Sequence, residues 1–214
     1  MWYPNAMILT YHEGACVRAQ VGDTTVVFSP VSKGSKNFKP TNFGADVAFI
    51  SLNHADMNGS DEAGRGEKQP FIISGPGEYE VKDITAAGFG TSSNYGADPS
   101  SAPSSHEATE GHSKASEGKR INTVYSLTLD GLSILYLGAL GGPLPAEVLE
   151  MDAPDILFVP IGGDGVLDAA EAEKLAVRLE AKIVIPLLYD AKSLKQFLKE
   201  AGEEKVMPID KLTI

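Results

Sequence analysis

The stretch Val47–Asn58, VAFISLNHADMN, decides the fold, because an apolar strand runs directly into a polar cluster. The run Val47–Ile50 predicts a strand buried on both faces, since a continuous apolar strand needs other layers on each side of its sheet. The polar side chains that follow are Ser51, Asn53, His54, Asp56 and Asn58. Chemistry often lies just past the C-terminal end of a core strand, where the loop supplies side chains. The stretch therefore predicts a candidate site at the end of a core strand.

The bulk composition is that of one globular domain spanning residues 1–214, with 43% hydrophobic and 22% charged residues. The formal net charge of -11 argues against a surface for duplex nucleic acid, which needs clustered Lys and Arg. The one cysteine, Cys16, excludes an internal disulfide and a Cys-rich zinc site. We expect a cytoplasmic protein, because there is no signal-like start and no apolar run of about 20 residues that could span a membrane.

The first half of the chain predicts short strands joined by turns. Besides Val47–Ile50, they are Met7–Tyr11, Ala15–Val21, Thr24–Phe28, Phe71–Ser74, Glu78–Val81 and Ile84–Phe89. The next segment, Thr91–Arg120, is dominated by Ser, Gly, Ala, Pro and charged residues. Such a composition buries too little apolar surface to order itself, so we expect a disordered insertion at 91–120, with a lid as the alternative.

The second half begins with a hairpin and then alternates strand and helix. Asp130-Gly131 lies between the apolar runs Thr123–Leu129 and Leu132–Leu137, which is a strong hairpin signal. A short helix over Pro145–Glu150 and four further elements follow: the strand Asp155–Pro160, a helix with the capping box Asp168/Glu171, the strand Lys182–Leu187, and a helix that stops at Gly202. Val206–Ile209 is a candidate closing strand. The two halves together predict an α/β (α+β) fold: a four-layer αββα sandwich of two mixed β-sheets flanked by helices.

Several segments occur together in a familiar order. They are Tyr11–Cys16, Val47–Asn58, Gly75–Val81, Asn122–Gly131, Tyr136–Gly141, Asp155–Gly163, Asp168–Ala172 and Ile183–Tyr189. With this set the chain resembles the metallo-β-lactamase fold superfamily, in particular the bacterial branch of small Zn-dependent hydrolases related to the ascorbate-phosphate lactonase. The resemblance covers nearly the whole chain outside 91–120, and it implies the αββα sandwich.

The resemblance also implies a metal site with missing ligands. In that family a cluster His-x-His-x-Asp-His holds zinc, which activates a bound water for hydrolysis. Its second His falls on His54 and its Asp on Asp56. The other ligand positions that we place hold side chains that do not bind zinc as His or Asp would: Leu52, Met57, Ala139 and Leu188. The metal-binding motif is therefore expected to be degenerate.

Two functions remain open. The first is a protein that has lost its dinuclear metal site and hydrolase activity, and acts by binding or assembly without a cofactor. The alternative is a phosphodiesterase, lactonase or esterase that uses zinc or manganese in a rearranged, mononuclear site at His54 and Asp56. His106, His112 or Asp190 could complete such a site, whereas in a purely structural interpretation Asp56 caps a helix. The residues indicate no partner, nucleic acid or membrane, and they leave a homo-oligomer possible.

Other residues have structural interpretations. We expect His12 to be a structural hydrogen-bonding group and Cys16 to be a small buried side chain rather than a nucleophile. Gly162–Gly165 lacks the Lys of a phosphate-binding loop and predicts a turn. Glu78 and Glu80 alternate with Tyr79, which is typical of exposed positions on a half-buried strand.

Overall fold

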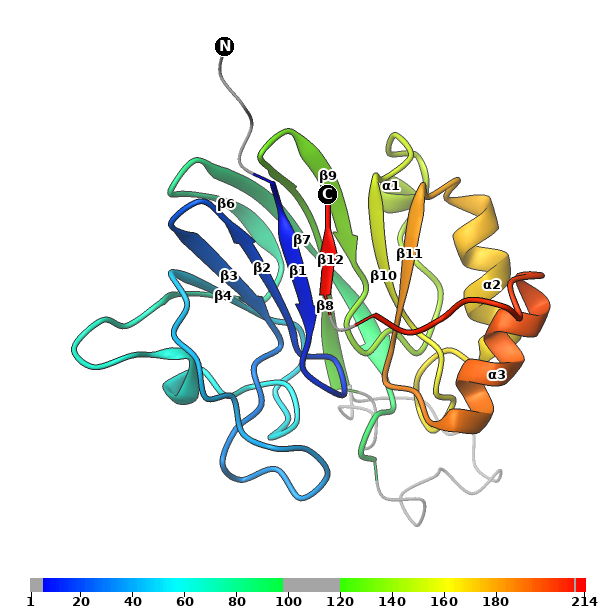
Figure 1. Cartoon of the computed structure of the whole chain (residues 1–214), viewed down its shortest axis with the longest axis horizontal. Coiled ribbons are helices and arrows are strands. Elements are labelled where there is room, and N and C mark those ends of the chain that lie inside the picture. The colour runs from blue at the N-terminus through cyan, green and yellow to red at the C-terminus, as the bar shows by residue number, and fades with distance from the viewer. Residues whose placement is uncertain (1–5, 98–119, 210) are drawn as a thin grey trace, which may run out of the picture.

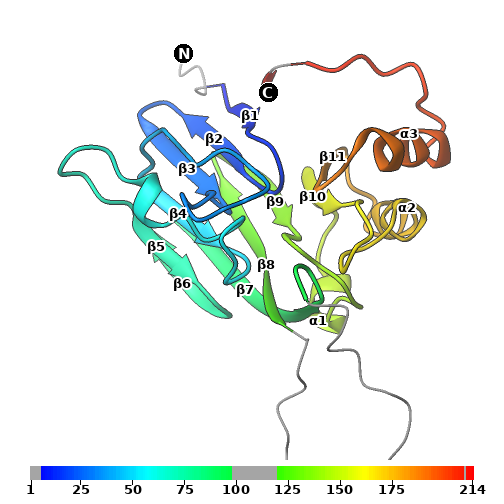
Figure 2. The same cartoon turned by 90° about the horizontal axis from the view of Figure 1, so that it is seen from below.

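The computed structural model describes residues 6–97, 120–209 and 211–214, which form two six-stranded sheets (Figures 1 and 2). The first sheet contains β1 (Ile8–Tyr11), β2 (Val17–Val21), β3 (Thr24–Phe28), β4 (Val47–Ile50), β5 (Phe71–Ser74) and β12 (Lys211–Thr213), in the order β12-β1-β2-β3-β4-β5. The second contains β6 (Gly77–Val81), β7 (Ile84–Ser93), β8 (Arg120–Leu129), β9 (Leu132–Tyr136), β10 (Ile156–Pro160) and β11 (Ile183–Leu187), in the order β11-β10-β9-β8-β7-β6. Each sheet mixes parallel and antiparallel pairs, and the predicted fold class is confirmed.

The outer layers of the two sheets differ in the described part of the chain. The α-helices are α1 (Ala146–Leu149), α2 (Ala169–Arg178) and α3 (Ala191–Glu200), and Figure 2 shows α2 and α3 outside β10 and β11. The outer face of the first sheet instead packs against loops and the 3-10 helix η1 (Asp61–Ala63). None of the described helices is long and apolar enough to cross a bilayer.

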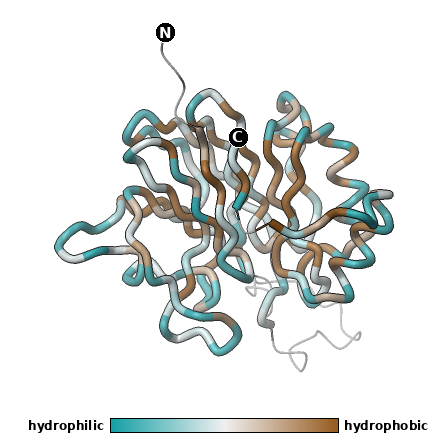
Figure 3. Tube along the Cα trace, viewed as in Figure 1, coloured by the Kyte–Doolittle hydropathy of each residue, from teal (hydrophilic) through white to brown (hydrophobic). Residues whose placement is uncertain are grey.

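Alternate side chains of the core strands are buried on opposite faces. In β4, Val47 and Phe49 join the core between the sheets, whereas Ala48 packs under the loop layer. In β10, Phe158 faces the first sheet and Leu157 faces the helices. Figure 3 shows the hydrophobic colour along these strands. Burial on both faces explains why the apolar runs are continuous rather than alternating.

The local signals in the second half have the expected structural effect. Asp130 and Gly131 have φ values of 50° and 79°, as a two-residue hairpin turn between β8 and β9 requires. Asp168 and Glu171 form the predicted capping box of α2. Helix α3 ends just before Gly202, which has a φ of 72°.

Two predictions of element boundaries are wrong. Residues 91–93 and Arg120 are not loop, because they extend the antiparallel pairing of β7 and β8; residues 98–119 of the predicted insertion lie outside the described part. The closing strand is Lys211–Thr213 rather than Val206–Ile209. Leu212 pairs with Leu9 and packs on the core, whereas Ile209 remains 67% exposed. The pairing of Lys211–Thr213 with β1 and the packing of Leu212 on the core thus fix the position of the last strand.

Candidate functional site

Asp56 is the buried centre of a polar cluster just beyond the end of β4. Its carboxylate is 1% exposed and accepts hydrogen bonds from Ser35 Oγ at 2.6 Å, Asn37 Nδ2 at 2.8 Å and Tyr95 Oη at 2.7 Å. The donors come from the loop after β3 and from the segment after β7. Asp56 therefore ties two distant segments to the end of β4. It caps no helix, because the next helical turn, η1, follows Ser60.

The negative charge of this cluster lies on Asp56. Burial alone raises the pKa of Asp56, but the three hydrogen-bond donors and the nearby His54 outweigh it, so that the pKa lies below its usual value. Burial, and then the bond to Asp56, raise the pKa of the Tyr95 phenol. At neutral pH Asp56 is therefore an ionised acceptor and Tyr95 a protonated donor. This pairing stabilises the arrangement of the two segments around Asp56.

His54 is held beside Asp56 with both ring nitrogens engaged or closely approached. Its Nδ1 accepts the Asp56 backbone N–H at 3.2 Å and lies 3.6 Å from Asp56 Oδ2. In a neutral imidazole with Nδ1 as acceptor, the proton is on Nε2. A Cβ placed on Gly96 would lie 2.9 Å from Nε2, so only a glycine leaves room for the imidazole at this point. The Tyr95 ring packs edge-on against the imidazole at 5.3 Å.

The four positions where the resemblance places lost ligands are part of the main hydrophobic core. Leu52, Met57, Ala139 and Leu188 all belong to the cluster between the sheets, and none is more than 9% exposed. Phe38 and Tyr95 pack against the same cluster from the surrounding loops. The end of the sandwich beyond β4, β9 and β11 is therefore filled by apolar side chains.

Asp190 and His12 lie outside the Asp56 cluster. Asp190 caps α3, where its carboxylate accepts the Ser193 N–H at 2.7 Å. His106 and His112 lie outside the described residues. His12 packs on Phe43 at 4.5 Å between ring centroids, and its buried Nε2 has no hydrogen-bond partner in the described structure. The predicted hydrogen-bonding role is thus wrong for that atom, and burial, with the nearby Arg18, lowers the His12 pKa.

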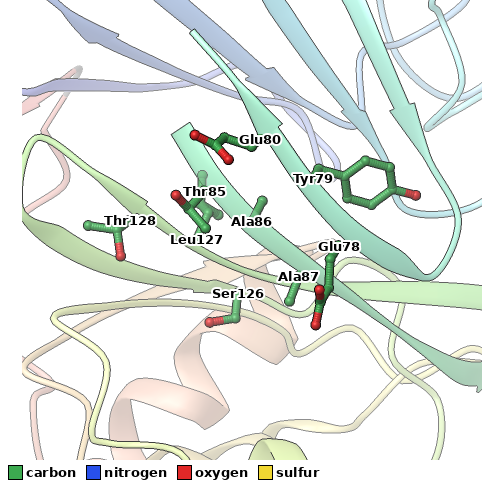
Figure 4. A pocket seen from close by; sticks show the side chains of 9 residues that line it. All are labelled: Glu78, Tyr79, Glu80, Thr85, Ala86, Ala87, Ser126, Leu127 and Thr128. Atoms are coloured by element: carbon green, nitrogen blue, oxygen red, sulfur yellow. The ribbon is translucent and has the colours of Figure 1, made fainter. Parts of the chain in front are cut away.

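Cys16 and the glutamates of β6 behave as predicted. Burial raises the pKa of the Cys16 thiol to about 12, which leaves it unreactive at neutral pH. Glu78 and Glu80 are exposed beside a broad hollow over the uncovered outer face of β6, β7 and β8 (Figure 4). The rest of its lining consists of Tyr79, Thr85, Ala86, Ala87, Ser126, Leu127 and Thr128. These residues offer two carboxylates and hydroxyl groups, without a cation or imidazole to assist them.

Sequence reasoning missed the three donors to Asp56. Ser35 and Asn37 lie in a polar loop and Tyr95 lies in the expected insertion, so no periodic pattern marks them. Their separations of 21, 19 and 39 residues from Asp56 hide the contacts.

The profile of the Beta-lactamase superfamily domain matches residues 8–188. The chain belongs to the beta-lactamase superfamily. A UPF0173 metal-dependent hydrolase of Bacillus velezensis is 25% identical over 196 residues, covering 86% of each chain. A superfamily structure from Thermotoga maritima has a TM-score of 0.65 and 27% identity, and the match covers 90% of this chain and 84% of the other. A structure from Parabacteroides distasonis with a TM-score of 0.62 is 16% identical and shows the shared fold; the match covers 94% and 96% of the two chains.

Members of the superfamily that bind zinc need several His and carboxylate ligands with free lone pairs. Across the described residues, no group of three His, Cys, Asp or Glu side chains is placed to hold a metal ion. The carboxylate of Asp56 already accepts three hydrogen bonds, and Nδ1 of His54 accepts another. The described side chains therefore do not fit a two-metal centre.

Proposed function

We propose that this chain is a superfamily member that has lost the dinuclear metal site and acts by binding or assembly rather than by hydrolysis. The observation that carries the proposal is the burial of Leu52, Met57, Ala139 and Leu188 in one hydrophobic cluster. A zinc site at this edge would require several of these apolar positions to supply imidazole or carboxylate groups.

The polar residues support the same proposal. A metal at the carboxylate of Asp56 would compete with the three hydrogen bonds that its two oxygens already accept from Ser35, Asn37 and Tyr95. Two retained ligands, His54 and Asp56, are too few for a stable zinc site by themselves. The same two residues have a sufficient structural role in holding Tyr95 and the loop after β3 against β4.

Metal analysis tests the proposal directly. The full chain is purified without metal, incubated with zinc or manganese in separate samples, freed of unbound ion, and measured by mass spectrometry of the elements. We expect well below 0.1 equivalent of either metal, an order-of-magnitude limit for a chain without a formed site. A stoichiometry near one that disappears in Asp56→Ala would overturn the proposal.

A metal-dependent hydrolase with a mononuclear site is the second candidate. It is favoured by the retained proximity of His54 Nδ1 and Asp56 Oδ2, at 3.6 Å, and by relatives that are named metal-dependent hydrolases. Bound zinc would lower the pKa of a water molecule, so that hydroxide is available as a nucleophile near neutral pH. The test compares phosphodiester, lactone and ester hydrolysis by the metal-treated chain with that of His54→Ala. Hydrolysis that requires both added metal and His54 would establish this candidate.

The finer assignments remain proposals. The ascorbate-phosphate lactonase branch rests on the sequence resemblance, and the superfamily match does not distinguish branches. A cytoplasmic location stays a prediction from the sequence. A homo-oligomer and the identity of any partner stay predictions.

A further inference from the structure

We propose that this chain associates with further copies of itself by docking helix α3 of one copy onto the outer face of β6, β7 and β8 of the next. We call this surface the open face; it consists of Glu78, Glu80, Thr85, Ala87, Ser126 and Thr128 (Figure 4). The lysine stripe of α3 consists of Lys192, Lys195 and Lys199. The two surfaces lie on different sides of the molecule, because α3 packs outside β10 and β11 (Figures 1 and 2).

The open face continues a face that helices already cover. Further along the same strands, Phe89 and Val124 pack in the cluster that contains Val148 of α1. Beyond that point Thr85 and Thr128 are exposed beside a hollow of about 640 Å³. In a sandwich of this class, helices are the elements that cover the outer faces of the sheets. A helix is therefore the element that fits over the open face.

The chemistry of the open face selects a cationic helix. Glu78 and Glu80 lie two residues apart on one side of β6, whereas Tyr79 points away from the hollow (Figure 4). The described lining contains no Lys, Arg or His, so nothing within the hollow balances the two carboxylates. An apolar occupant would take them out of water without a partner, which is unfavourable. An occupant that carries ammonium groups would pair with them instead.

The outer side of α3 carries such groups at a matching spacing. Its three lysines are exposed and follow one another at intervals of three and four residues, which places them on one side of a helix. The opposite side packs inward through the buried Phe197. Lys195 and Lys199 are separated by about 6 Å along the helix axis, and Glu78 and Glu80 by about 7 Å along the strand. Two ammonium–carboxylate pairs can therefore form together.

The arrangement of the two surfaces predicts how the assembly grows. A contact between different surfaces is heterologous, so a pair of copies still has one unoccupied lysine stripe and one unoccupied open face. Further copies add until a ring closes, and the species formed extend beyond a dimer. This contact goes beyond the proposed loss of metal and is tested separately from it, because metal content and molecular mass are independent measurements.

Sedimentation velocity of the full chain over a concentration series tests the contact. At physiological salt we expect the average mass to rise with concentration past that of a dimer. An exposed ion pair changes affinity by about two- to fivefold. The stripe variant Lys195→Glu/Lys199→Glu and the open-face variant Glu78→Lys/Glu80→Lys should therefore each weaken association by more than about tenfold. A monomer at every concentration, or undiminished association of either variant, would overturn the proposal.

A matched control and a mixing experiment make the test specific. Lys36→Glu/Lys39→Glu makes the same change of charge at exposed positions in the loop after β3, and it should associate nearly as the native chain does. An equimolar mixture of the stripe variant and the open-face variant should recover association, because each surface then meets one of opposite charge. Thermal unfolding verifies that all three variants are folded. No recovery on mixing, or an equal loss in the control variant, would show that the contact lies elsewhere.

Discussion

Replacing Asp56 by Asn separates a structural carboxylate from a metal ligand, because it keeps the shape of the side chain and removes its charge. The carboxylate accepts three short hydrogen bonds, between 2.6 and 2.8 Å, in a setting where it is 1% exposed. In the metal-free chain these bonds should make Asp56→Asn destabilising. A carboxylate kept for a metal would instead contribute little to the stability of the metal-free protein.

The size of the effect follows from the three bonds. A hydrogen bond to a charged acceptor contributes about 1.5–3 kcal/mol, and a neutral one about 0.5–1.5 kcal/mol. Loss of the charge thus weakens each bond by about 1 kcal/mol, and the amide nitrogen must also face one of the former donors. Because neighbouring bonds are not additive, we expect a total loss of about 2–3 kcal/mol in the free energy of unfolding at pH 7.

Urea unfolding followed by circular dichroism measures this loss. The pKa of Asp56 is lowered on folding, so its contribution is complete above about pH 4, the value of an unfolded Asp, and falls away as the pH drops through the folded pKa. The difference between native chain and Asp56→Asn should shrink accordingly below pH 4. Asp23→Asn, at an exposed turn, is the matched control and should stay within about 0.5 kcal/mol. The reasoning is refuted if Asp56→Asn is neutral without metal, or costs stability only after zinc is added.

Three further predictions concern other parts of the fold. Burial raises the Asp46 pKa, but the bonds from Lys68, the Thr25 N–H and Lys82 outweigh it and lower that pKa to about 2. Asp46→Asn should therefore lower the free energy of unfolding in urea by about 2 kcal/mol at pH 7, and by progressively less between pH 4 and pH 2. Glu180 follows α2 with a φ of 52°, so Glu180→Gly should raise stability by about 1 kcal/mol in thermal unfolding, whereas Glu173→Gly inside α2 should lower it by about as much. The buried Cys16 thiol should resist a disulfide reagent in the native chain and react at once in denaturant; rapid labelling without denaturant would contradict its burial.

The fold could be predicted largely from local patterns, because each strand of the core carries its own signal. The continuous apolar run Val47–Ile50 reflects burial on both faces of the first sheet. Asp130-Gly131 and the Asp168 capping box act through the backbone of a few adjacent residues, so they work in any surroundings. The last strand could not be placed in this way. Lys211–Thr213 is selected by pairing with β1, near the opposite end of the chain, and not by its own composition.

The candidate site could be predicted only in part, for the same reason. His54 and Asp56 were found because they directly follow a recognisable strand. Tyr95 carries no local signal, and its role depends on where β7 ends and on a carboxylate 39 residues earlier in the chain. A non-periodic polar segment can supply a decisive hydrogen bond, and only the folded arrangement of the strands shows which side chain supplies it.

The proposed loss of metal also requires that something else hold the loops at this edge together. In a metal protein, binding of the ion contributes directly to folding, since the ligands of several loops converge on it. Here Leu188 has a φ of 52°, an unfavourable conformation for a residue with a side chain, and its N–H donates to Gly14 O at 2.8 Å. Burial of the Leu188 side chain in the shared core offsets that cost. On the polar side, the Asp56 carboxylate links two loops, because it accepts hydrogen bonds from both of them. We therefore infer that apolar packing and one buried carboxylate together replace the cross-linking role of a metal centre.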